Sequence, residues 1–218
     1  HIDHAHNTTI SDNVLSENYD GIYLGFSNNN TIKDNIVTNT LHLSIYLYES
    51  RNNTIIGNTV SNAQTGFYIT RGAKGNIIYH NNLINNGYQA TVSYETGVNI
   101  WDDGYPSGGN YWSDYTGVDE KSRPNQDQPG SDGIGDTPYV IDAGNRDRYP
   151  LMNPFGAPPP TEIHDIAIVS VVPSTTEVYV GRIVNITVTV QNQGNSTETF
   201  DITCKYELEG TEHTISII

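Results

Sequence analysis

At 218 residues the chain is long enough for one large or two small domains, and its formal net charge of −15 argues against a nucleic-acid partner, because phosphate binding needs clustered Lys and Arg. Its single cysteine, Cys204, excludes an internal disulfide and a cysteine-based metal cluster. No apolar run approaches the roughly 20 residues of a membrane helix, so we expect no membrane insertion within this segment.

Residues 1–97 contain four copies of one repeat: NTTISDNVLSENYDGIYL, NNTIKDNIVTNTLHLSIYL, NNTIIGNTVSNAQTGFYI and GNIIYHNNLINNGYQATV. Their equivalent asparagines, Asn13, Asn35, Asn58 and Asn81, are 22, 23 and 23 residues apart. Around each of them apolar residues alternate with polar ones, which indicates short β-strands. Since one copy cannot bury its apolar stripe alone, the pattern predicts a right-handed parallel β-helix of about four coils, with these asparagines hydrogen-bonded as a ladder.

Three tyrosines occupy outward positions of the second strand in successive coils. Tyr23, Tyr46 and Tyr68 lie between inward apolar residues, so they are expected to stand one above another on the surface. Such an aromatic row can stack on sugar rings or on a partner protein. Two alternatives stay open: tyrosine simply suits a β-surface, or the chain that follows covers the row.

Two groups in the coils invite a chemical interpretation. His1, His4 and His6 form an HxxHxH pattern that can ligate copper, but His6 precedes Asn7 where a coil turn is expected, so the segment also fits a repeat cut through its middle. Asp12 and Asp34 align as a carboxylate row, yet the next two coils carry Gly57 and His80 there. We therefore expect the histidines to serve the coil rather than to bind copper, and we expect no catalytic row.

Residues 98–155 hold both tryptophans, Trp101 and Trp112, among many Tyr and Gly residues. Aromatic residues at this density directly after a repeat array predict a cap over the end of the coil stack. Asp102 and Asp103, beside Trp101, are the other candidates for a catalytic pair. A glycosidase needs two carboxyl groups facing across a sugar, whereas these two lie in the expected cap.

Three motifs in this order, NYWSDY at 110–115, DGIGDTPY at 132–139 and RYPLMNPF at 148–155, resemble the NosD-type β-helix family over residues 1–155. That family includes periplasmic copper-binding accessory proteins and archaeal cell-surface proteins with carbohydrate-binding and sugar-hydrolase-type coils. The resemblance implies the β-helix fold and a cell-surface location, or a periplasmic one in a bacterium. It brings no copper motif that can be placed residue by residue.

Relatives often carry a fuller acidic run before Thr-Pro-Tyr, where this chain has Pro129, Gly130 and Ser131. Calcium needs six to eight oxygen ligands. Asp127, Asp132, Asp136 and the Ile134 carbonyl supply part of such a set, so the alternatives are a calcium loop and, as the favoured interpretation, a turn-rich loop without a cation.

Residues 156–162 form a proline-rich linker, and residues 163–218 change to a Val, Ile and Thr composition. Amphipathic strands at 184–190 and 200–208, separated by QGNST, predict the start of a β-sandwich, with Cys204 in the apolar register. The order of DIAIVSVVPS, VGRIVNITVTVQNQG and a paired strand resembles a CARDB-type, cell-adhesion-related immunoglobulin-like domain. A complete sandwich needs about 100 residues, so we expect an incomplete one, either because the sequence is truncated or because another copy donates strands.

Acceptor triplets for N-glycosylation occur at Asn7, Asn29, Asn52, Asn185 and Asn195. Together these patterns predict a non-catalytic extracellular structural or adhesive protein, including the subunit of a surface layer or filament, with surface glycans or other copies of itself as partners. The alternatives are a glycan-binding module, a fragment of a polysaccharide lyase or hydrolase, and a copper-binding periplasmic accessory protein.

Overall fold

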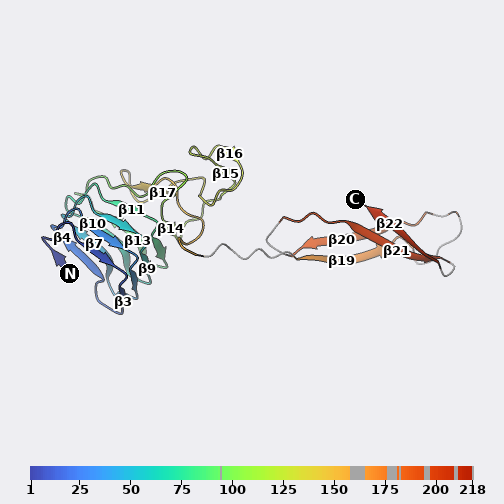
Figure 1. Ribbon diagram of the computed structural model, residues 1–218, viewed down its shortest axis with the longest axis horizontal. Coiled ribbons are helices and arrows are strands. Elements are labelled where there is room, and N and C mark those ends of the chain that lie inside the picture. Colours follow the sequence, from blue (N-terminus) through green and yellow to red (C-terminus); the bar gives the residue numbers. More distant parts are fainter. Residues whose placement is uncertain are drawn as a thin grey trace. The chain divides into compact units, whose positions relative to one another are not determined.

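The computed structural model of the protein describes residues 1–93, 95–157, 165–175, 181, 183–193, 197–208 and 211–217. The chain divides into two compact units, His1–Ala157 and Pro158–Ile218, and each is described by itself. Every regular element among the described residues is a β-strand (Figure 1). The predicted all-β class is therefore confirmed.

Each coil of the first unit contributes a strand to each of three parallel sheets. Sheet I contains β1 (Ile2–Asp3), β4 (Ile22–Gly25), β7 (Leu43–Tyr48), β10 (Thr65–Thr70) and β13 (Tyr88–Val92). Sheet II contains β2 (Thr9–Ser11), β5 (Thr31–Lys33), β8 (Thr54–Ile56) and β11 (Ile77–Tyr79). Sheet III contains β3 (Val14–Ser16), β6 (Ile36–Thr38), β9 (Thr59–Ser61), β12 (Asn82–Ile84) and β14 (Tyr111–Trp112).

The register pairs equivalent positions of successive repeats, so Ile32 lies opposite both Ile10 and Ile55. A parallel β-helix of about four coils, as the repeat period predicts, is confirmed. Inward side chains of all coils share one apolar core, which includes Leu24, Ile32, Val37, Ile45, Leu47, Ile55, Val60, Phe67, Ile69, Ile78 and Leu83. Each such side chain contributes about 1.5–3 kcal/mol when it is fully removed from water.

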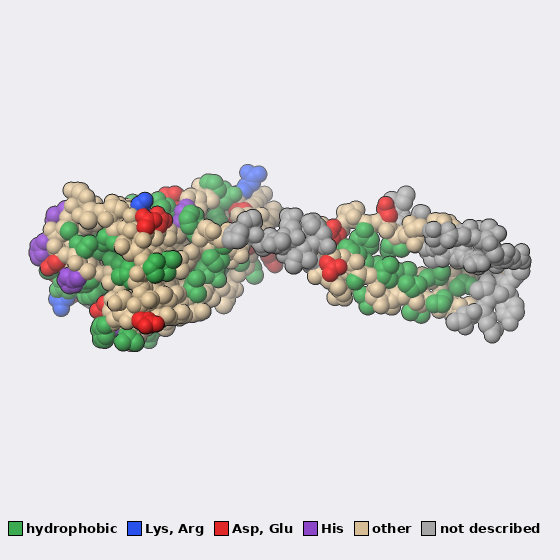
Figure 2. All heavy atoms as spheres, turned by 60° about the horizontal axis from the view of Figure 1, so that its bottom comes forward, with side chains coloured by type: hydrophobic (Ala, Val, Ile, Leu, Met, Phe, Trp, Pro, Cys, Tyr) green, Lys and Arg blue, Asp and Glu red, His purple; other side chains and the backbone are tan. Residues whose placement is uncertain are grey.

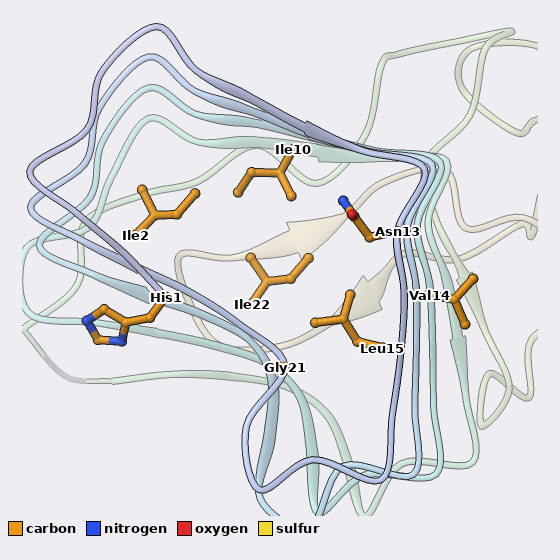
Figure 3. Close-up of a pocket in the computed structure, with 8 residues that line it drawn as sticks. All are labelled: His1, Ile2, Ile10, Asn13, Val14, Leu15, Gly21 and Ile22. Atoms are coloured by element: carbon orange, nitrogen blue, oxygen red, sulfur yellow. The ribbon is translucent and has the colours of Figure 1, made fainter.

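Figure 3 looks into the first coil and shows how alternation sorts the side chains. Ile10, Leu15 and Ile22 point into the coil, whereas Val14 points away from it and is 73% exposed. The hollow at this end of the stack is thus the apolar interior of the first coil.

The aligned asparagines form a ladder along an inner corner of the coils. The Nδ2 group of Asn13 donates to Oδ1 of Asn35 at 2.9 Å, and the same bond recurs at 2.9 Å from Asn35 to Asn58 and from Asn58 to Asn81. The ladder continues past the last repeat, because Asn81 donates to Oδ1 of Asn110 at 2.9 Å. These side chains are fully buried from Asn35 onward, so they serve the fold and not the surface.

A second ladder, which the sequence analysis did not identify, runs along another corner. The backbone N–H of Asn30 donates to Oδ1 of Asn53, and Nδ2 of Asn53 and Asn76 donate onward at 3.0 and 2.8 Å. This ladder reaches Asn99, whose N–H donates to Oδ1 of Asn145 at 3.0 Å.

Residues 98–155 end both ladders, and they do so through one short segment. Asp147 accepts hydrogen bonds from the N–H of Asn110 at 2.7 Å and from the indole Nε1 of Trp112 at 2.9 Å. Asn145 accepts from the indole of Trp101 at 3.2 Å. Each ladder therefore finishes on a buried acceptor that also fixes a tryptophan.

The three sequence motifs of residues 98–155 are in contact with one another. Tyr139 stacks on Trp112, with ring centroids 4.1 Å apart and planes inclined by 7°, and the Tyr115 hydroxyl donates to the Thr137 carbonyl at 2.6 Å. Leu151 forms bridges with Tyr111 and with Ile134. Two small hairpins complete the segment: β15 (Lys121–Ser122) pairs with β16 (Gln128–Pro129), and β17 (Tyr139–Val140) pairs with β18 (Arg146–Asp147). The predicted aromatic cluster is present.

The second unit contains two antiparallel strand pairs, of which β19 (Ile166–Pro173) pairs with β20 (Ile186–Asn192) and β21 (Ile202–Leu208) pairs with β22 (Thr211–Ile217). The amphipathic segments at 184–190 and 200–208, read from sequence as neighbours across a turn, thus each pair with a different strand. Of the linker predicted at 156–162, only residues 156 and 157 are among those described.

Candidate functional site

The tyrosine row lies on the outer face of sheet I. Tyr46 is in register with Tyr23 on one side and with Tyr68 on the other, and the ring centroids are 5.0 and 5.2 Å apart. The flanking residues Ile45 and Leu47 point into the core, and this alternation turns the rings outward. All three tyrosines are half-buried, so part of each ring remains accessible.

Further rings extend the row into a wider surface, which we call the tyrosine face and define as His1, Tyr23, Tyr46, Tyr48 and Tyr68. The His1 ring stacks on Tyr23 at 4.2 Å, and Tyr48 meets Tyr46 edge-on at 6.3 Å. The planes of neighbouring tyrosines are inclined by 52° to 88°, so the face presents both ring faces and ring edges.

Two hollows flank the ridge formed by Tyr46 and Tyr68. The first also has Thr70, Arg71, Ser93 and Glu95 in its walls, and the second has His42, Gln64, Tyr88 and Thr91. Aromatic rings beside a few hydrogen-bonding groups are the composition that sugar binding requires, because a sugar ring has apolar C–H faces and a polar rim.

Two phenols of the tyrosine face, those of Tyr23 and Tyr46, have raised pKa values and therefore stay neutral near pH 7. Burial raises the pKa of Tyr46, and the neighbouring phenols of Tyr23, Tyr68 and Tyr48 raise it further, while Arg71 lowers it. Burial also raises the pKa of Tyr23, and the Asp3 carboxylate adds to that effect. The hydroxyls of Tyr23 and Tyr46 can consequently both donate a hydrogen bond to a ligand and accept one from it.

The polar residues of the hollows were missed by the sequence analysis because they do not recur at one repeat position. Arg71 lies at a corner with φ of 50°, where the equivalent residues of the other coils are His4, Phe26 and Glu49. The only feature of the sequence that could have pointed to the polar residues of the hollows is their closeness to the strand that carries Tyr68.

The acidic loop does not converge on a cation site among the described residues. Asp132 accepts from the N–H groups of Ile134 and Arg123, and Asp136 accepts from those of Lys121 and Glu120. Asp119, which the sequence analysis overlooked, accepts from Asp132 and Gly133.

The other two members of the predicted calcium set, Asp127 and Ile134, have contacts of their own. Asp127 is exposed and, among the described residues, accepts a hydrogen bond only from the neighbouring Gln128 amide, at 3.4 Å. Ile134 forms a β-bridge with Leu151. Asp119, Asp132 and Asp136 thus stabilise their own loop by accepting hydrogen bonds from its backbone N–H groups.

The N-terminal histidines point to different partners. His1 stacks on Tyr23, His4 stacks on Phe26 at 5.0 Å, and Nδ1 of His6 accepts from the N–H of Asn28 at 3.0 Å. Histidine side chains are visible at the coil end of the first unit in Figure 2. In the described part of the chain no three His, Cys, Asp or Glu side chains come together as a metal site, so these residues do not fit a copper centre.

Asp12 and Asp34 lie in a corner column together with Gly57 and His80. All four residues have φ between 55° and 69°, a left-handed conformation that Asp and Gly tolerate well. A Cβ at Gly57 would collide with Asp34, so the glycine leaves room for the carboxylate above it. The alignment of the two acids is explained by the turn.

Asp102 and Asp103 also serve separate structural roles. Asp102 is buried and binds Arg148 through two side-chain hydrogen bonds of 3.0 and 2.7 Å. Asp103 is exposed and accepts from the Ser107 hydroxyl at 2.8 Å.

Ser107, His80 and Asp103 lie close together but lack the geometry of a nucleophile and its base. Nε2 of His80 is 2.8 Å from the Ser107 carbonyl and donates to it, and the Ser107 hydroxyl donates to Asp103. The histidine therefore has no free lone pair at Nε2 to take the serine proton.

Three of the five glycosylation triplets share one corner. Asn7, Asn29 and Asn52 are exposed, with φ of 56°, 57° and 55°. In the triplets at Asn29 and Asn52, the second asparagine, Asn30 or Asn53, belongs to the second ladder. The coil structure therefore explains the Asn-Asn-Thr pattern without glycosylation. Asn185 is exposed, and Asn195 lies outside the described residues.

A family model described as periplasmic copper-binding protein (NosD) matches residues 1–117, which is more than half of the chain. No curated protein matches the chain, and no solved structure does. Within the described ranges there is no helix of the length and apolar composition that a membrane crossing requires.

Proposed function

Because this chain belongs to the family described as periplasmic copper-binding protein (NosD), we propose that it is a non-catalytic periplasmic or cell-surface β-helix protein that holds a saccharide on the tyrosine face. The periplasmic description of the family supports a location outside the cytoplasm. The family's copper description suggests no step here, since the N-terminal imidazoles are turned to separate partners.

The observation that carries the proposal is the ridge of Tyr46 and Tyr68 between two hollows whose walls offer hydroxyl, amide and charged groups. A saccharide lying across the ridge would place C–H faces on the rings and hydroxyls in the hollows. The rigid coil stack holds the rings in place before binding, which reduces the entropy lost on association.

A non-catalytic role is supported by the carboxylates. A glycosidase holds two carboxyl groups across its substrate, between about 5 and 9.5 Å apart. Asp3 lies close to Tyr23, and Glu95 lies in a wall of the first hollow. They come from the regions of the first and last strands of sheet I, so four coil steps separate them. Their placement favours binding without cleavage, which suits adhesion to a surface glycan.

The test is a glycan-array screen of the intact chain, followed by titration with the best-binding oligosaccharide. Tyr46→Ala should weaken binding about tenfold or more, the loss of at least ~1.4 kcal/mol expected for one central aromatic contact. Tyr79→Ala is the matched control, because Tyr79 is a half-buried tyrosine on the outer side of β11 in sheet II.

Tyr46→Phe should have an intermediate effect, because the ring remains and only the hydroxyl is lost. Absence of any glycan binding, or equal weakening by the Tyr46 and Tyr79 variants, would contradict the proposed function. Release of reducing or unsaturated sugars would contradict its non-catalytic part.

A further inference from the structure

A further hollow of distinct chemistry lies in the capping segment, residues 98–155, and has no residue in common with the tyrosine face or its two hollows. Its walls include Pro124, Gln126, Asp136, Arg146, Arg148 and Tyr149, and we call it the cap hollow. Arg146 and Arg148 lie two residues apart around the fully buried Asp147. Alternation along this extended segment therefore sends both guanidinium groups outward as Asp147 turns inward.

Arg148 is held in place before any ligand arrives. Its Nε and Nη2 groups donate to the two oxygens of Asp102 at 3.0 and 2.7 Å, and the guanidinium carbon lies 5.3 Å from the centre of the Tyr149 ring. Because a guanidinium has five N–H donors and this pairing uses two, the remaining three are available on the side away from Asp102.

Arg146 has no ion pair with any acid among the described residues. The acid in the same walls, Asp136, accepts backbone hydrogen bonds on both of its oxygens, from Lys121 at 3.0 Å and from Glu120 at 3.3 Å. Both oxygens of Asp136 are thus engaged by its own loop, no ion pair joins them to Arg146, and Arg146 keeps its donors for a group in the hollow.

Two neighbouring guanidinium groups stand out in a chain with 10 basic and 25 acidic residues. The overall negative field repels anions at long range, so an anion can bind only where cations act at short distance. Guanidinium pairs match the planar oxygen geometry of carboxylate and the oxygens of phosphate, with hydrogen bonds stronger than neutral ones.

We propose that the cap hollow is a binding site for an oxyanion, a carboxylate or phosphate group on a saccharide or small molecule, with Arg146 and Arg148 as its donors. The Tyr149 ring and the two prolines that border the hollow, Pro124 and Pro138, provide apolar surface beside the anion. This site is independent of the tyrosine face, and its test does not depend on the proposed function.

The experiment is a titration of the intact chain at low ionic strength with three probes: glucuronate, inorganic phosphate and uncharged glucose. Arg146→Gln removes one guanidinium group. The Arg146 side chain makes no hydrogen bond among the described residues, so the fold should persist, and thermal melting checks this. Arg51→Gln is the control, because Arg51 is an exposed arginine of the coils that donates to the Gly72 carbonyl.

We expect glucuronate or phosphate to bind, glucose not to bind, and Arg146→Gln to weaken anion binding about tenfold or more, as loss of charge-assisted hydrogen bonds does. The anion that binds more tightly identifies the carboxylate or the phosphate as the group recognised. Failure of both anions to bind at millimolar concentration would overturn the proposal. So would equal weakening by Arg146→Gln and Arg51→Gln, which would indicate only a general charge effect.

Discussion

The carboxylate that ends the first ladder should make the stability of the cap depend on pH. Burial raises the pKa of Asp147 from 3.8 to about 7, although the N–H groups of Asn110, Trp112 and Tyr149 partly oppose that rise by hydrogen bonding to the carboxylate. A carboxyl group with a raised pKa in the folded state binds more protons there than in the unfolded chain. Its contribution to stability is therefore complete below pH 3.8 and is lost as the pH rises to about 7.

The size of this effect follows from the two pKa values. At about 1.4 kcal/mol for each pH unit between them, the loss across the window is on the order of 4 kcal/mol. Asp147→Asn cannot ionise, so it removes this slope. It also costs about 1–3 kcal/mol, because one carboxyl oxygen becomes an amide nitrogen, which cannot accept, and the Tyr149 N–H or the Trp112 indole loses its acceptor.

We therefore expect Asp147→Asn to be less stable than the unaltered chain at pH 4 and to equal or exceed it at pH 8. Urea unfolding followed by tryptophan fluorescence measures this in the right place, since both tryptophans donate to the residues that end the ladders. The difference between variant and unaltered chain cancels the titration of other carboxylates, and Asp103→Asn, an exposed position, is the control. A stability difference that stays constant from pH 4 to pH 8 would refute the reasoning.

Three further predictions concern the ladder, the cap and the acidic loop. Asn58→Ala should lower the free energy of unfolding in urea by at least about 3 kcal/mol, because it leaves several buried donors and acceptors unpaired. Asn13→Ala, at the exposed first coil, should lower it by about 1 kcal/mol. Equal losses for the two variants would contradict the ladder. Gly109→Ala should lower the melting temperature of the cap, since a Cβ there would collide with the Asp147 carboxylate, and an unchanged melting curve would argue against that packing. Removing divalent cations with EDTA should leave the melting temperature unchanged because carboxylates of the acidic loop accept backbone N–H groups, and a clear drop would instead establish a bound cation.

The coils could be predicted from the sequence because stacking imposes a strict period on it. Every inward residue must meet its equivalent in the next coil, so Ile32 and Ile55 recur at the spacing of the ladder asparagines. The second ladder escaped notice for a local reason. In the Asn-Asn-Thr triplets the first asparagine takes the left-handed corner and the second turns inward, and the pattern was interpreted only as a glycosylation signal.

The contacts of the cap could not be predicted in the same way. Asp102 binds Arg148 across 46 residues, and Trp112 donates to Asp147 across 35 residues, with no period to relate the partners. Composition indicated that aromatic residues gather here. A single sequence does not indicate that one aspartate is buried and accepts the hydrogen bonds that end a ladder. The two arginines of the cap hollow were missed because their meaning depends on Asp147 lying between them and pointing inward.

The alternation of the strands separates the residues that build the coil from those that can bind. In sheet I, Ile45 and Leu47 contribute to the core, while Tyr46 between them contributes its ring to the surface. Outward residues can therefore change with little loss of stability, and the same coil stack can present different binding faces. The cap has no such freedom, because Asp147 and Asn145 end the ladders. By this argument, variants of the tyrosine face should lose ligand while keeping their fold, and variants at the ends of the ladders should lose stability first.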